Sequence, residues 1–467
     1  MSDLNQHRVA LAKKIAYAAP AFSLAVIGIP VYVYIPKFYA DVVGVHVTLL
    51  GYILFSVRIF DAVTDPAIGY LSDRTRTRFG RRRPYIAVGA VLTALAMLLL
   101  FNPPHAGASI ETLWFGVWIY LLFLFWTVVT VPYEALGPEI TFDYQERISL
   151  FGIRDGLLIA GTLAAAASPA LVAWLFGLSA EPADERAKFF WISVGYAPLL
   201  IATAWWCVTA VEEIPQRPKQ QTSFGMASGL RQVFKNRPFV ILLAAYTISA
   251  VGNNLPATLI LFYVQYVLQS DLADIFLLEY FLTGILFLPA WMAVARRTGK
   301  KTAWLASMAL NTGAFTGVFF LGPGDAWIYG ILVFFSGMGF GATLAIPSAI
   351  QADVIDYDEL LTGERREGQY IGLWSISKKL AAALGIGIGL TLLGMSGYVP
   401  NVTQTPEVQM MLRVLYALVP SLCNLLGFVI ALWYPIDASA HRKIRQAVDS
   451  KQSGYPAANE LTSQKPA

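Results

Sequence analysis

The chain has 467 residues, of which 56% are hydrophobic and only 14% charged, and its mean hydropathy is +0.56. A soluble protein of this length could not cover so much apolar surface, so the composition excludes an ordinary soluble domain and indicates a polytopic membrane protein. Cys207 and Cys423 lie in separate apolar stretches and predict no disulfide framework. The polar, basic start of the chain lacks a small-residue cleavage site, so we expect no cleavable signal peptide.

Apolar stretches of about 20 residues or more predict twelve transmembrane helices. They cover residues 12–38, 48–71, 84–102, 113–136, 149–177, 189–211, 239–267, 274–295, 302–321, 326–350, 369–395 and 412–434. The widest polar gap, 212–238, predicts a cytoplasmic linker between two six-helix bundles at 1–211 and 239–434. Residues 435–467 are polar and are expected to form a largely disordered cytoplasmic tail. The predicted fold is an all-α membrane protein of two pseudo-repeated six-helix bundles.

Basic residues give the predicted orientation. Most of the 34 Lys and Arg residues lie in the N-terminus, in the loops that follow even-numbered spans, and in the C-terminal tail. Cytoplasmic segments carry such an excess, so we expect both termini to be cytoplasmic and the protein to lie in the plasma (inner) membrane. Four basic residues remain inside predicted spans: Arg58, Arg154, Lys378 and Lys379.

The second predicted span carries three ionisable side chains at membrane depth, Arg58, Asp61 and Asp65. Such residues are costly in a bilayer and favour a functional site. Their i, i+3, i+7 spacing puts them within roughly 60° of one another on a helix, so they share one stripe that must face the protein interior or a water-filled cavity. The alternative is that Arg58 and Asp61 form an interior ion pair that only fixes helix packing.

Other polar stripes occur in the fourth and fifth spans. Thr127, Thr130 and Glu134 repeat the i, i+3, i+7 spacing and predict a hydrogen-bonding wall for a substrate. Glu134 could instead lie near the cytoplasmic helix end, wetted by solvent or held by loop arginines. Arg154 is suited to a bidentate grasp of vicinal hydroxyls or a carboxylate, although the adjacent Asp155 could simply neutralise it.

The eleventh span has Tyr370, Trp374 and Lys378 at four-residue spacing, which predicts a stacking face for a sugar ring next to an amine. Aromatic residues of membrane proteins also serve as core and interfacial belts, so this stripe has both interpretations. Lys378 and Asp61 are both expected near the bilayer centre. An ion pair between the two halves could therefore close in the absence of a cation and open when one binds.

The loop after the second span is rich in arginine. Asp73, Arg74 and Arg58 are predicted gating residues, because an acid at a helix end facing basic loops can stabilise one conformation and release in the other. Arg58 is also a candidate scaffold for the two aspartates of its own span. The same arginines could also attract anionic lipid headgroups. The loop motif recurs weakly after the eighth span, as expected for repeated halves with a substrate site between them. Chance recurrence under the positive-inside bias is the other explanation.

Several motifs together point to one family. They are Arg58-Ile-Phe-Asp-Ala-Val-Thr-Asp-Pro-Ala-Ile-Gly69, Asp73-Arg74, Gly80-Arg-Arg-Arg-Pro84, Pro132-Tyr133, Pro138-Glu139, Glu146-Arg147, Arg154, Asp353, Asp356-Tyr357, Trp374 and Lys378. With them the chain resembles the glycoside–pentoside–hexuronide:cation symporters, the melibiose-permease-like branch of the major facilitator superfamily. The resemblance covers nearly the whole chain and implies a sodium- or proton-coupled symporter that works by alternating access.

The resemblance also implies residue roles. Asp61 and Asp65 would hold the coupling cation, as metal ligands only if that cation is Na⁺, and Thr127 would assist them. Arg154 would contact sugar, and Lys378 would link the cation and sugar sites. Thr64 would be part of the cation site, but it replaces an Asn that often precedes the second aspartate in sodium-coupled members, so proton coupling stays open.

Departures from the family pattern affect the predicted substrate. Ala25 and Thr130 stand where melibiose-type permeases have sugar-binding aspartates, and Glu134 replaces their tryptophan of the fourth span. Galactoside recognition of that kind is therefore not implied. A lysolipid or other amphipathic solute is the principal alternative cargo.

The predicted function is secondary active symport of a sugar, glycoside or sugar acid with Na⁺ or H⁺. We expect no cofactor, no enzyme activity and no nucleic-acid partner, since no metal-ligand cluster, nucleophile elbow or phosphate loop is visible. The expected partners are a small polar solute, a carbohydrate, and membrane lipid, and the expected state is a monomer. A membrane sensor that binds ligand without accumulating it is the remote alternative.

Overall fold

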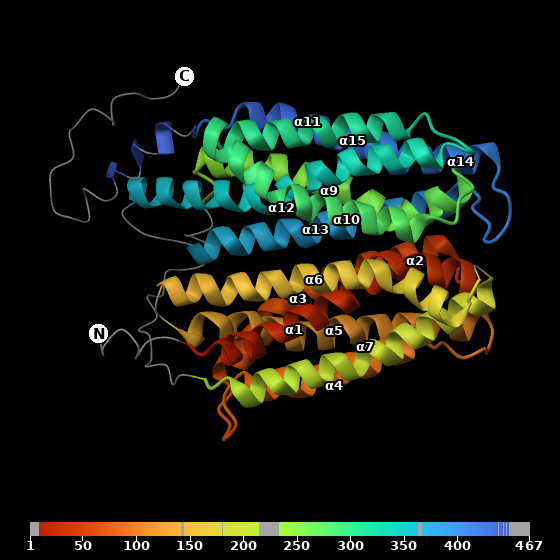
Figure 1. The fold of residues 1–467 in the computed structure, drawn as a ribbon, viewed down its shortest axis with the longest axis horizontal. Helices are drawn as coiled ribbons and strands as arrows, with labels where there is room; N and C mark the ends of the chain where they lie inside the picture. The colour runs from red at the N-terminus through yellow and green to blue at the C-terminus, as the bar shows by residue number, and fades with distance from the viewer. Residues whose placement is uncertain are drawn as a thin grey trace.

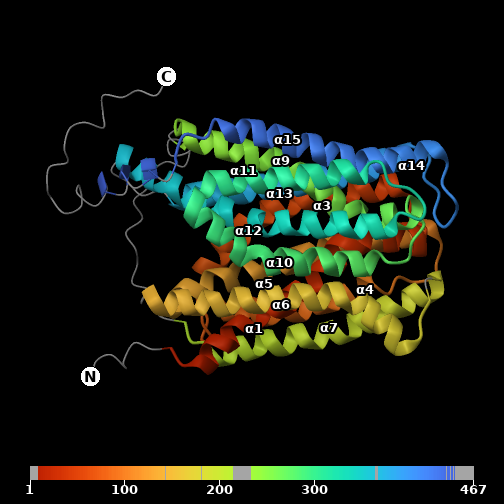
Figure 2. The ribbon, with the colours of Figure 1, turned by 45° about the horizontal axis from the view of Figure 1, so that its top comes forward.

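The computed structural model describes residues 9–141, 144–179, 181–213, 233–362, 367–437, 439–441, 443–444 and 446–447. The described chain is helical, and its long helices run side by side in two groups. The first and last described residues lie at the same end of the molecule, here called the terminal end (Figures 1 and 2). The other end is called the opposite end. Most of the predicted linker and tail lie outside the described residues.

The first group of helices comes from the N-terminal half. It comprises α1 (Leu11–Ile29), η2 (Pro30–Tyr34), α2 (Ile35–Lys37), η3 (Phe38–Val43), α3 (Val47–Arg74), α4 (Arg83–Leu100), α5 (Ala108–Ile140), α6 (Tyr144–Phe176) and α7 (Pro182–Ala210). The segments from α1 to η3 form one continuous span. Proline lacks a backbone N–H, so Pro30 and Pro36 each remove a helical hydrogen bond, and wider π-helical turns flank them.

The second group comes from the C-terminal half. It comprises α9 (Arg237–Tyr266), α10 (Ala273–Thr298), α11 (Lys300–Val318), α12 (Ala326–Thr362), α13 (Glu367–Met395), α14 (Pro406–Arg413), η4 (Val414–Leu418) and α15 (Val419–Leu432). The Asn236 side chain caps α9 by accepting a 3.2 Å hydrogen bond from the Phe239 amide. The last span, like the first, is built from consecutive helical segments.

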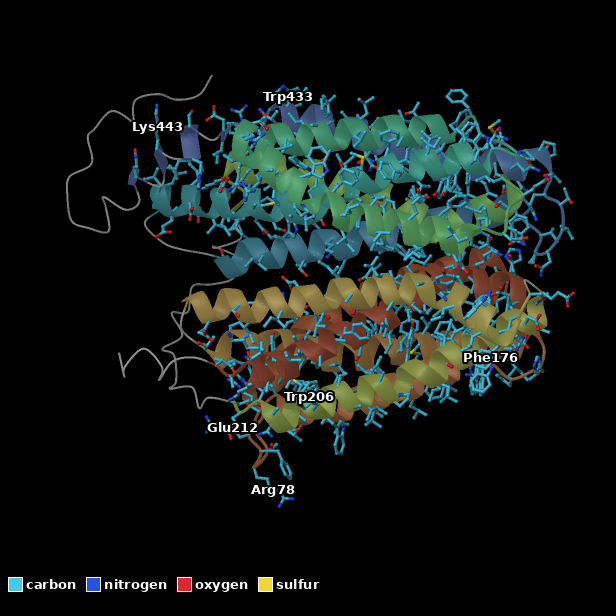
Figure 3. All side chains as sticks on the ribbon, viewed as in Figure 1. Arg78, Phe176, Trp206, Glu212, Trp433 and Lys443 are labelled. Atoms are coloured by element: carbon cyan, nitrogen blue, oxygen red, sulfur yellow. The ribbon has the colours of Figure 1, made fainter. Side chains whose placement is uncertain are left out.

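The predicted all-helical fold of two bundles is confirmed, and the number of spans agrees closely. Eleven helical spans in the described chain are long and apolar enough to cross a membrane. The remaining predicted span, the ninth, corresponds to α11, which has 19 residues and begins with two lysines. Exposed aromatic side chains lie toward both ends of the bundle, including Trp206, Trp433 and Phe176 (Figure 3), as in the aromatic belts of membrane proteins.

Helix α13 lies at the boundary between the halves and packs against both α3 and α9 (Figure 1). Glycine makes the close approach to α3 possible. A Cβ atom at Gly394 would lie 2.2 Å from Thr48 Oγ1, and one at Gly387 would lie 2.9 Å from Phe55 Cβ. Small residues let transmembrane helices approach closely, so these positions set how deeply α13 enters the N-terminal half.

Candidate cation and substrate site

A carboxylate pair on α3 forms the centre of the site. Thr127 on α5 donates its hydroxyl to Asp61 Oδ1 at 3.0 Å and lies 3.1 Å from Asp65 Oδ1. Lys379 on α13 reaches across from the C-terminal half, with Nζ 2.9 Å from Asp61 Oδ2 and also bonded to Asp65 Oδ2. Asp61 is buried and Thr127 is completely buried, whereas Asp65 is partly exposed. One ammonium group thus pairs with two carboxylates at the interface of the halves, and the charge of one carboxylate is left uncompensated by it.

Helix geometry explains why these groups converge. Asp61 and Asp65 are one turn apart on α3, so their side chains project in the same direction. The glycines of α13 bring that helix close enough for a lysine to span the gap. Carboxylate and hydroxyl oxygens are ligands suited to hard cations such as Na⁺, and carboxylates can equally accept a proton. The Lys379 ammonium therefore lies where a coupling cation would place its positive charge.

The inter-half ion pair expected of Lys378 is made instead by its neighbour. Lys378 is exposed and forms no ion pair with the α3 aspartates, whereas Lys379 contacts both. Successive residues of an α-helix point about 100° apart, so only one of two adjacent lysines can face the pair. The sequence had indicated the correct turn of the helix and the wrong residue within it.

Arg58 lies near the carboxylates in sequence but pairs with aromatic rings. Its guanidinium lies 4.1 Å from the Tyr32 ring centroid and 4.6 Å from that of Phe123. The side chain is buried, and it forms no ion pair with Asp61 or with any other described acid. The proposed Arg58–Asp61 packing pair is therefore absent among the described residues. Cation–π contacts hold the guanidinium against the first span and α5 instead.

The polar residues expected to bind substrate in the N-terminal half have different surroundings. Arg154 on α6 forms an ion pair with the adjacent Asp155, with Nη2 2.7 Å from Oδ1, and its guanidinium lies 4.7 Å from the Phe151 ring centroid. Thr130 donates its hydroxyl to the Trp126 carbonyl of its own helix at 3.0 Å. Glu134 is exposed. None of these contacts joins them to the carboxylate pair.

The predicted aromatic stripe on α13 does not form one continuous face. Trp374 is half-buried and stacks on Tyr246 of α9, with ring centroids 4.0 Å apart. Tyr370 is completely buried: its hydroxyl accepts a 3.0 Å hydrogen bond from Asn236, and its ring packs edge-on against Phe239. Tyr370 therefore belongs to the core of the C-terminal half, because its ring has no exposed face to offer a sugar.

Thr64 also turns back to its own helix. Its hydroxyl donates to the Asp61 carbonyl at 3.2 Å, a local hydrogen bond that side chains of this type commonly make within helices. The hydroxyl that contacts both carboxylates is that of Thr127. Thr64 thus lies beside the carboxylate pair without a side-chain hydrogen bond to it among the described residues.

A charged cluster closes the terminal end of the N-terminal half. Asp73 pairs with Arg82 at 2.8 Å, and Arg81 and Arg82 both contact the buried Glu139, at 2.5 and 3.1 Å. Glu213 accepts hydrogen bonds from the backbone amides of residues 81–83. Of the three predicted gating residues, Asp73 joins this cluster, Arg74 lies over the Tyr70 ring at 4.1 Å, and Arg58 packs on aromatic rings as described above.

We expect Glu139→Gln to lower the free energy of unfolding by about 3 kcal/mol, because it removes the buried one of the two carboxylates that pair with the buried Arg82 guanidinium. Thermal unfolding of the detergent-solubilised protein measures the loss. Glu181→Gln, at an exposed position before α7, is the matched control and should leave the midpoint unchanged. Equal midpoints for both variants would contradict the structural role of Glu139.

A second polar contact between the halves lies at the opposite end, and the sequence analysis missed it. The buried Asp41 of η3 accepts hydrogen bonds from Tyr266 at 2.7 Å and from Tyr398, and it pairs with Lys37 at 2.8 Å. Asn401 donates its side-chain amide to the Asp41 carbonyl at 2.6 Å. We call Asp41, Tyr266, Tyr398 and Asn401 the Asp41 latch. The sequence did contain a signal for this contact, because Asp41 is a charged residue in the otherwise apolar stretch 38–43.

Two further hydrogen bonds join the halves near this latch. Tyr34 donates to Asp274 at 2.6 Å, and Lys37 donates to Gln265. Within the part of the chain that the structure describes, the hydrogen bonds between the halves are therefore confined to the Lys379 site and the opposite end.

Two six-helix bundles with a charged, buried site between them are the arrangement of a secondary transporter of the major facilitator type. The chain belongs to the MFS/sugar transport protein family, whose sequence model matches residues 16–438. It is therefore an integral membrane transporter.

Relatives similar along most of their length carry carbohydrate names. The chain is 28% identical to a glucuronide carrier protein homolog of Escherichia coli strain K12, with 89% of this chain and 90% of that protein covered. It is 26% identical to an isoprimeverose transporter of Lactiplantibacillus pentosus, with 93% and 91% covered. It is 27% identical to a putative sulfoquinovose importer of Salmonella typhimurium, with 88% and 87% covered.

Solved structures support the fold alone. A bacterial homologue of the iron transporter ferroportin, in an inward-facing state, superposes with a TM-score of 0.68 at 13% identity and covers 91% of this chain and 99% of its own. A nucleoside transporter gives a TM-score of 0.65 at 11% identity, with 90% and 99% covered.

Proposed function

We propose that the protein couples the uptake of a carbohydrate, as a sugar, glycoside or sugar acid, to the entry of Na⁺ or H⁺. The observation that carries this proposal is the Lys379 ammonium bound by Asp61 and Asp65 across the two halves. A chemically separate cation that binds the same carboxylates must displace Lys379. Cation binding would then change a contact between the halves, which is what coupling to alternating access requires.

The family and the relatives support a carbohydrate as cargo. The names of the three relatives above refer to a glucuronide, isoprimeverose and sulfoquinovose. In this chain Arg154, Thr130, Glu134 and Trp374 supply a guanidinium, a hydroxyl, a carboxylate and an indole from helices of both halves. These are the groups that would hydrogen-bond sugar hydroxyls and stack on a sugar ring. We propose these four as substrate-binding residues, together with the exposed Lys378.

The choice between Na⁺ and H⁺ depends on how the carboxylates respond when Lys379 leaves. Two adjacent carboxylates without a compensating charge favour uptake of either one proton or one metal ion. Thr127 adds a hydroxyl oxygen that a sodium ion can use as a ligand. The excess of basic residues in the terminal segments supports a cytoplasmic terminal end, so that the Asp41 latch would face the outside.

Uptake into proteoliposomes of purified protein tests the proposal. We expect a labelled glycoside to accumulate above its external concentration when a Na⁺ or H⁺ gradient is imposed, and only to equilibrate when the gradient is dissipated. Binding without accumulation under both gradients would instead indicate a sensor. Accumulation of a lysolipid but of no carbohydrate would overturn the substrate class while leaving cation coupling intact.

A further inference from the structure

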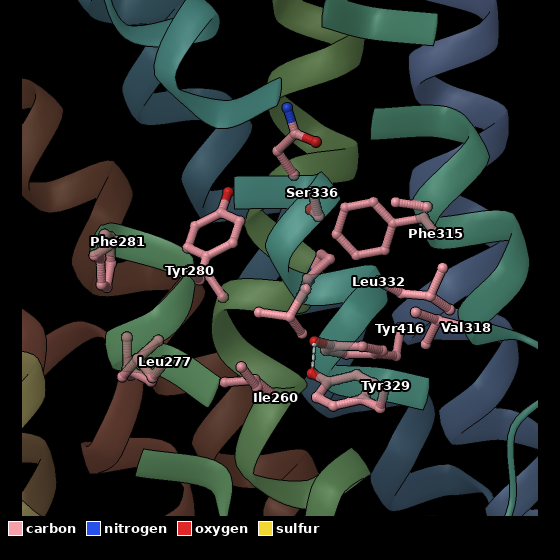
Figure 4. A pocket seen from close by; sticks show the side chains of 16 residues that line it. Ile260, Leu277, Tyr280, Phe281, Phe315, Val318, Tyr329, Leu332, Ser336 and Tyr416 are labelled. Carbon is pink, nitrogen blue, oxygen red and sulfur yellow. Dashed lines mark hydrogen bonds between the residues drawn. The ribbon is translucent and has the colours of Figure 1, made fainter. Parts of the chain in front are cut away.

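A cavity of about 70 Å³ lies in the C-terminal half between α9, α10, α11, α12 and η4, with Val33 of the N-terminal half at its margin (Figure 4). Its walls are mainly apolar and aromatic. The rings that line it are Tyr280, Phe281, Phe315, Tyr329 and Tyr416. A buried water needs about 10–15 Å³, so the cavity has room for several waters or for a group the size of one phenyl ring.

One end of this cavity is polar and rigid. Asn253 lines it, and its Oδ1 accepts hydrogen bonds from Asn424 at 3.0 Å and from Asn311 at 3.3 Å. Ser336 donates to Asn311 Oδ1 at 2.8 Å. These two hydrogen bonds use the side-chain oxygen of Asn253 as acceptor. The side-chain N–H groups of Asn253 are therefore the ones available to donate to a ligand. In Figure 4 the Tyr280 hydroxyl points toward the end that carries Ser336, and it has no hydrogen-bond partner among the described residues.

The other end is closed by a neutral pair. The hydroxyls of Tyr329 and Tyr416 are 2.6 Å apart and share one hydrogen bond, as the dashed line in Figure 4 shows. Both side chains are buried. This end therefore offers mainly apolar ring surface, and its two hydroxyls are engaged with each other through one hydrogen bond.

The polar end lies nearest to the cation site. A Cβ atom at Gly385 would lie 2.6 Å from Asn254 Cβ, so the start of the cavity is level with Gly385 on α13. Gly385 follows Lys379 by six residues, about 9 Å along a helix. Along α9, Ile260 lies roughly 10 Å closer to the opposite end than Asn253 does. Tyr266 of the Asp41 latch lies about 9 Å beyond Ile260 in the same direction. The cavity thus occupies the layer between the Lys379 site and the latch.

We propose that this cavity is an aglycone subsite, which takes the apolar group of a transported glycoside while its sugar lies toward the Lys379 layer. The inference rests on the proposed function and narrows its substrate class to glycosides with a small apolar or aryl aglycone. A polyhydroxylated ring would lose its hydrogen bonds to water against these walls, whereas an aryl or alkyl group gains by leaving water. Asn253 and Tyr280, at the polar end, would donate to the glycosidic oxygen or a neighbouring hydroxyl.

Competition for uptake by a series of glycosides tests the subsite. For each sugar that is transported, the free sugar, methyl glycoside and phenyl glycoside are compared as inhibitors in proteoliposomes. We expect the phenyl glycoside to bind at least tenfold more tightly than the free sugar. Equal affinities across the series would overturn the inference but leave cation-coupled sugar uptake standing. Loss of cation dependence for every member would instead contradict the proposed function.

A cavity-filling variant makes the test specific to this site. Ala257 lines the cavity, so Ala257→Phe should raise the KM for the phenyl glycoside at least tenfold and change that for the free sugar less than twofold. Ala202→Phe, at an exposed position of α7, is the matched control. Ala257→Leu serves if the larger side chain prevents folding. An equal loss for both substrates in each filled variant would overturn the subsite.

Discussion

Replacing either carboxylate of the α3 pair with an amide is expected to abolish accumulation of solute against its gradient. In Asp61→Asn or Asp65→Asn, one carboxylate remains, and the Lys379 ammonium is sufficient to neutralise its charge. A coupling cation then finds no net negative charge at the site and has little advantage over Lys379. Downhill exchange of solute should persist, because it requires the halves to move but no cation to be carried. Gradient-driven uptake and solute exchange in proteoliposomes measure the two activities.

Removing Lys379 should raise the affinity for the coupling cation, whereas removing either carboxylate should lower it. Lys379→Ala leaves two neighbouring carboxylates without their internal partner, so a coupling cation should bind roughly tenfold or more tightly while coupled transport is lost. The cation concentration that half-saturates substrate binding reports the change. Lys378→Ala is the matched control, since it removes the same charge one residue away, where no ion pair to the aspartates exists. A larger effect of Lys378→Ala than of Lys379→Ala would contradict the coupling role that we give to Lys379 and would assign it to Lys378.

The sequence predicted the fold well because bilayer physics leaves few alternatives. A helix is required wherever the backbone crosses lipid, so apolar length alone located the spans. The α3 stripe was visible for the same reason, since charges at membrane depth are rare. Thr127, predicted on family resemblance to assist the carboxylates, does contact both of them.

The remaining features depended on rotation of helices about their axes, which composition does not specify. Lys378 and Lys379 differ by one residue, and only the packing of α13 against α3 decides which of them faces Asp61. Tyr370 and Trp374 share a helical stripe but have different partners. Tyr370 is hydrogen-bonded to Asn236 in the core, whereas Trp374 stacks on Tyr246. The aromatic cavity was equally invisible, because its rings come from several helices far apart in sequence.

The Asp41 latch predicts that a single hydroxyl helps to keep the opposite end closed. Asp41 and Lys37 belong to the same half and stay together when the halves separate, whereas the bonds from Tyr266 and Tyr398 must break. A hydrogen bond to a charged group contributes about 1.5–3 kcal/mol. Tyr398→Phe should therefore raise the ratio of open to closed states at this end by roughly 10- to 150-fold.

Distances between spin labels at His105→Cys and Val402→Cys would report that shift, because both positions are exposed near the opposite end and belong to different halves. A longer mean distance in Tyr398→Phe is the expected result. Tyr263→Phe is the matched control: its hydroxyl donates to the Val318 carbonyl within the C-terminal half, at 2.7 Å, so its loss should lower stability without changing the distance. If both variants lengthened the distance equally, general loosening of the C-terminal half would explain the result. If neither did, the Tyr398 hydrogen bond would carry no part of the closed state, and the closure at this end would have to come from the other contacts between the halves, such as the hydrogen bonds from Tyr34 to Asp274 and from Lys37 to Gln265.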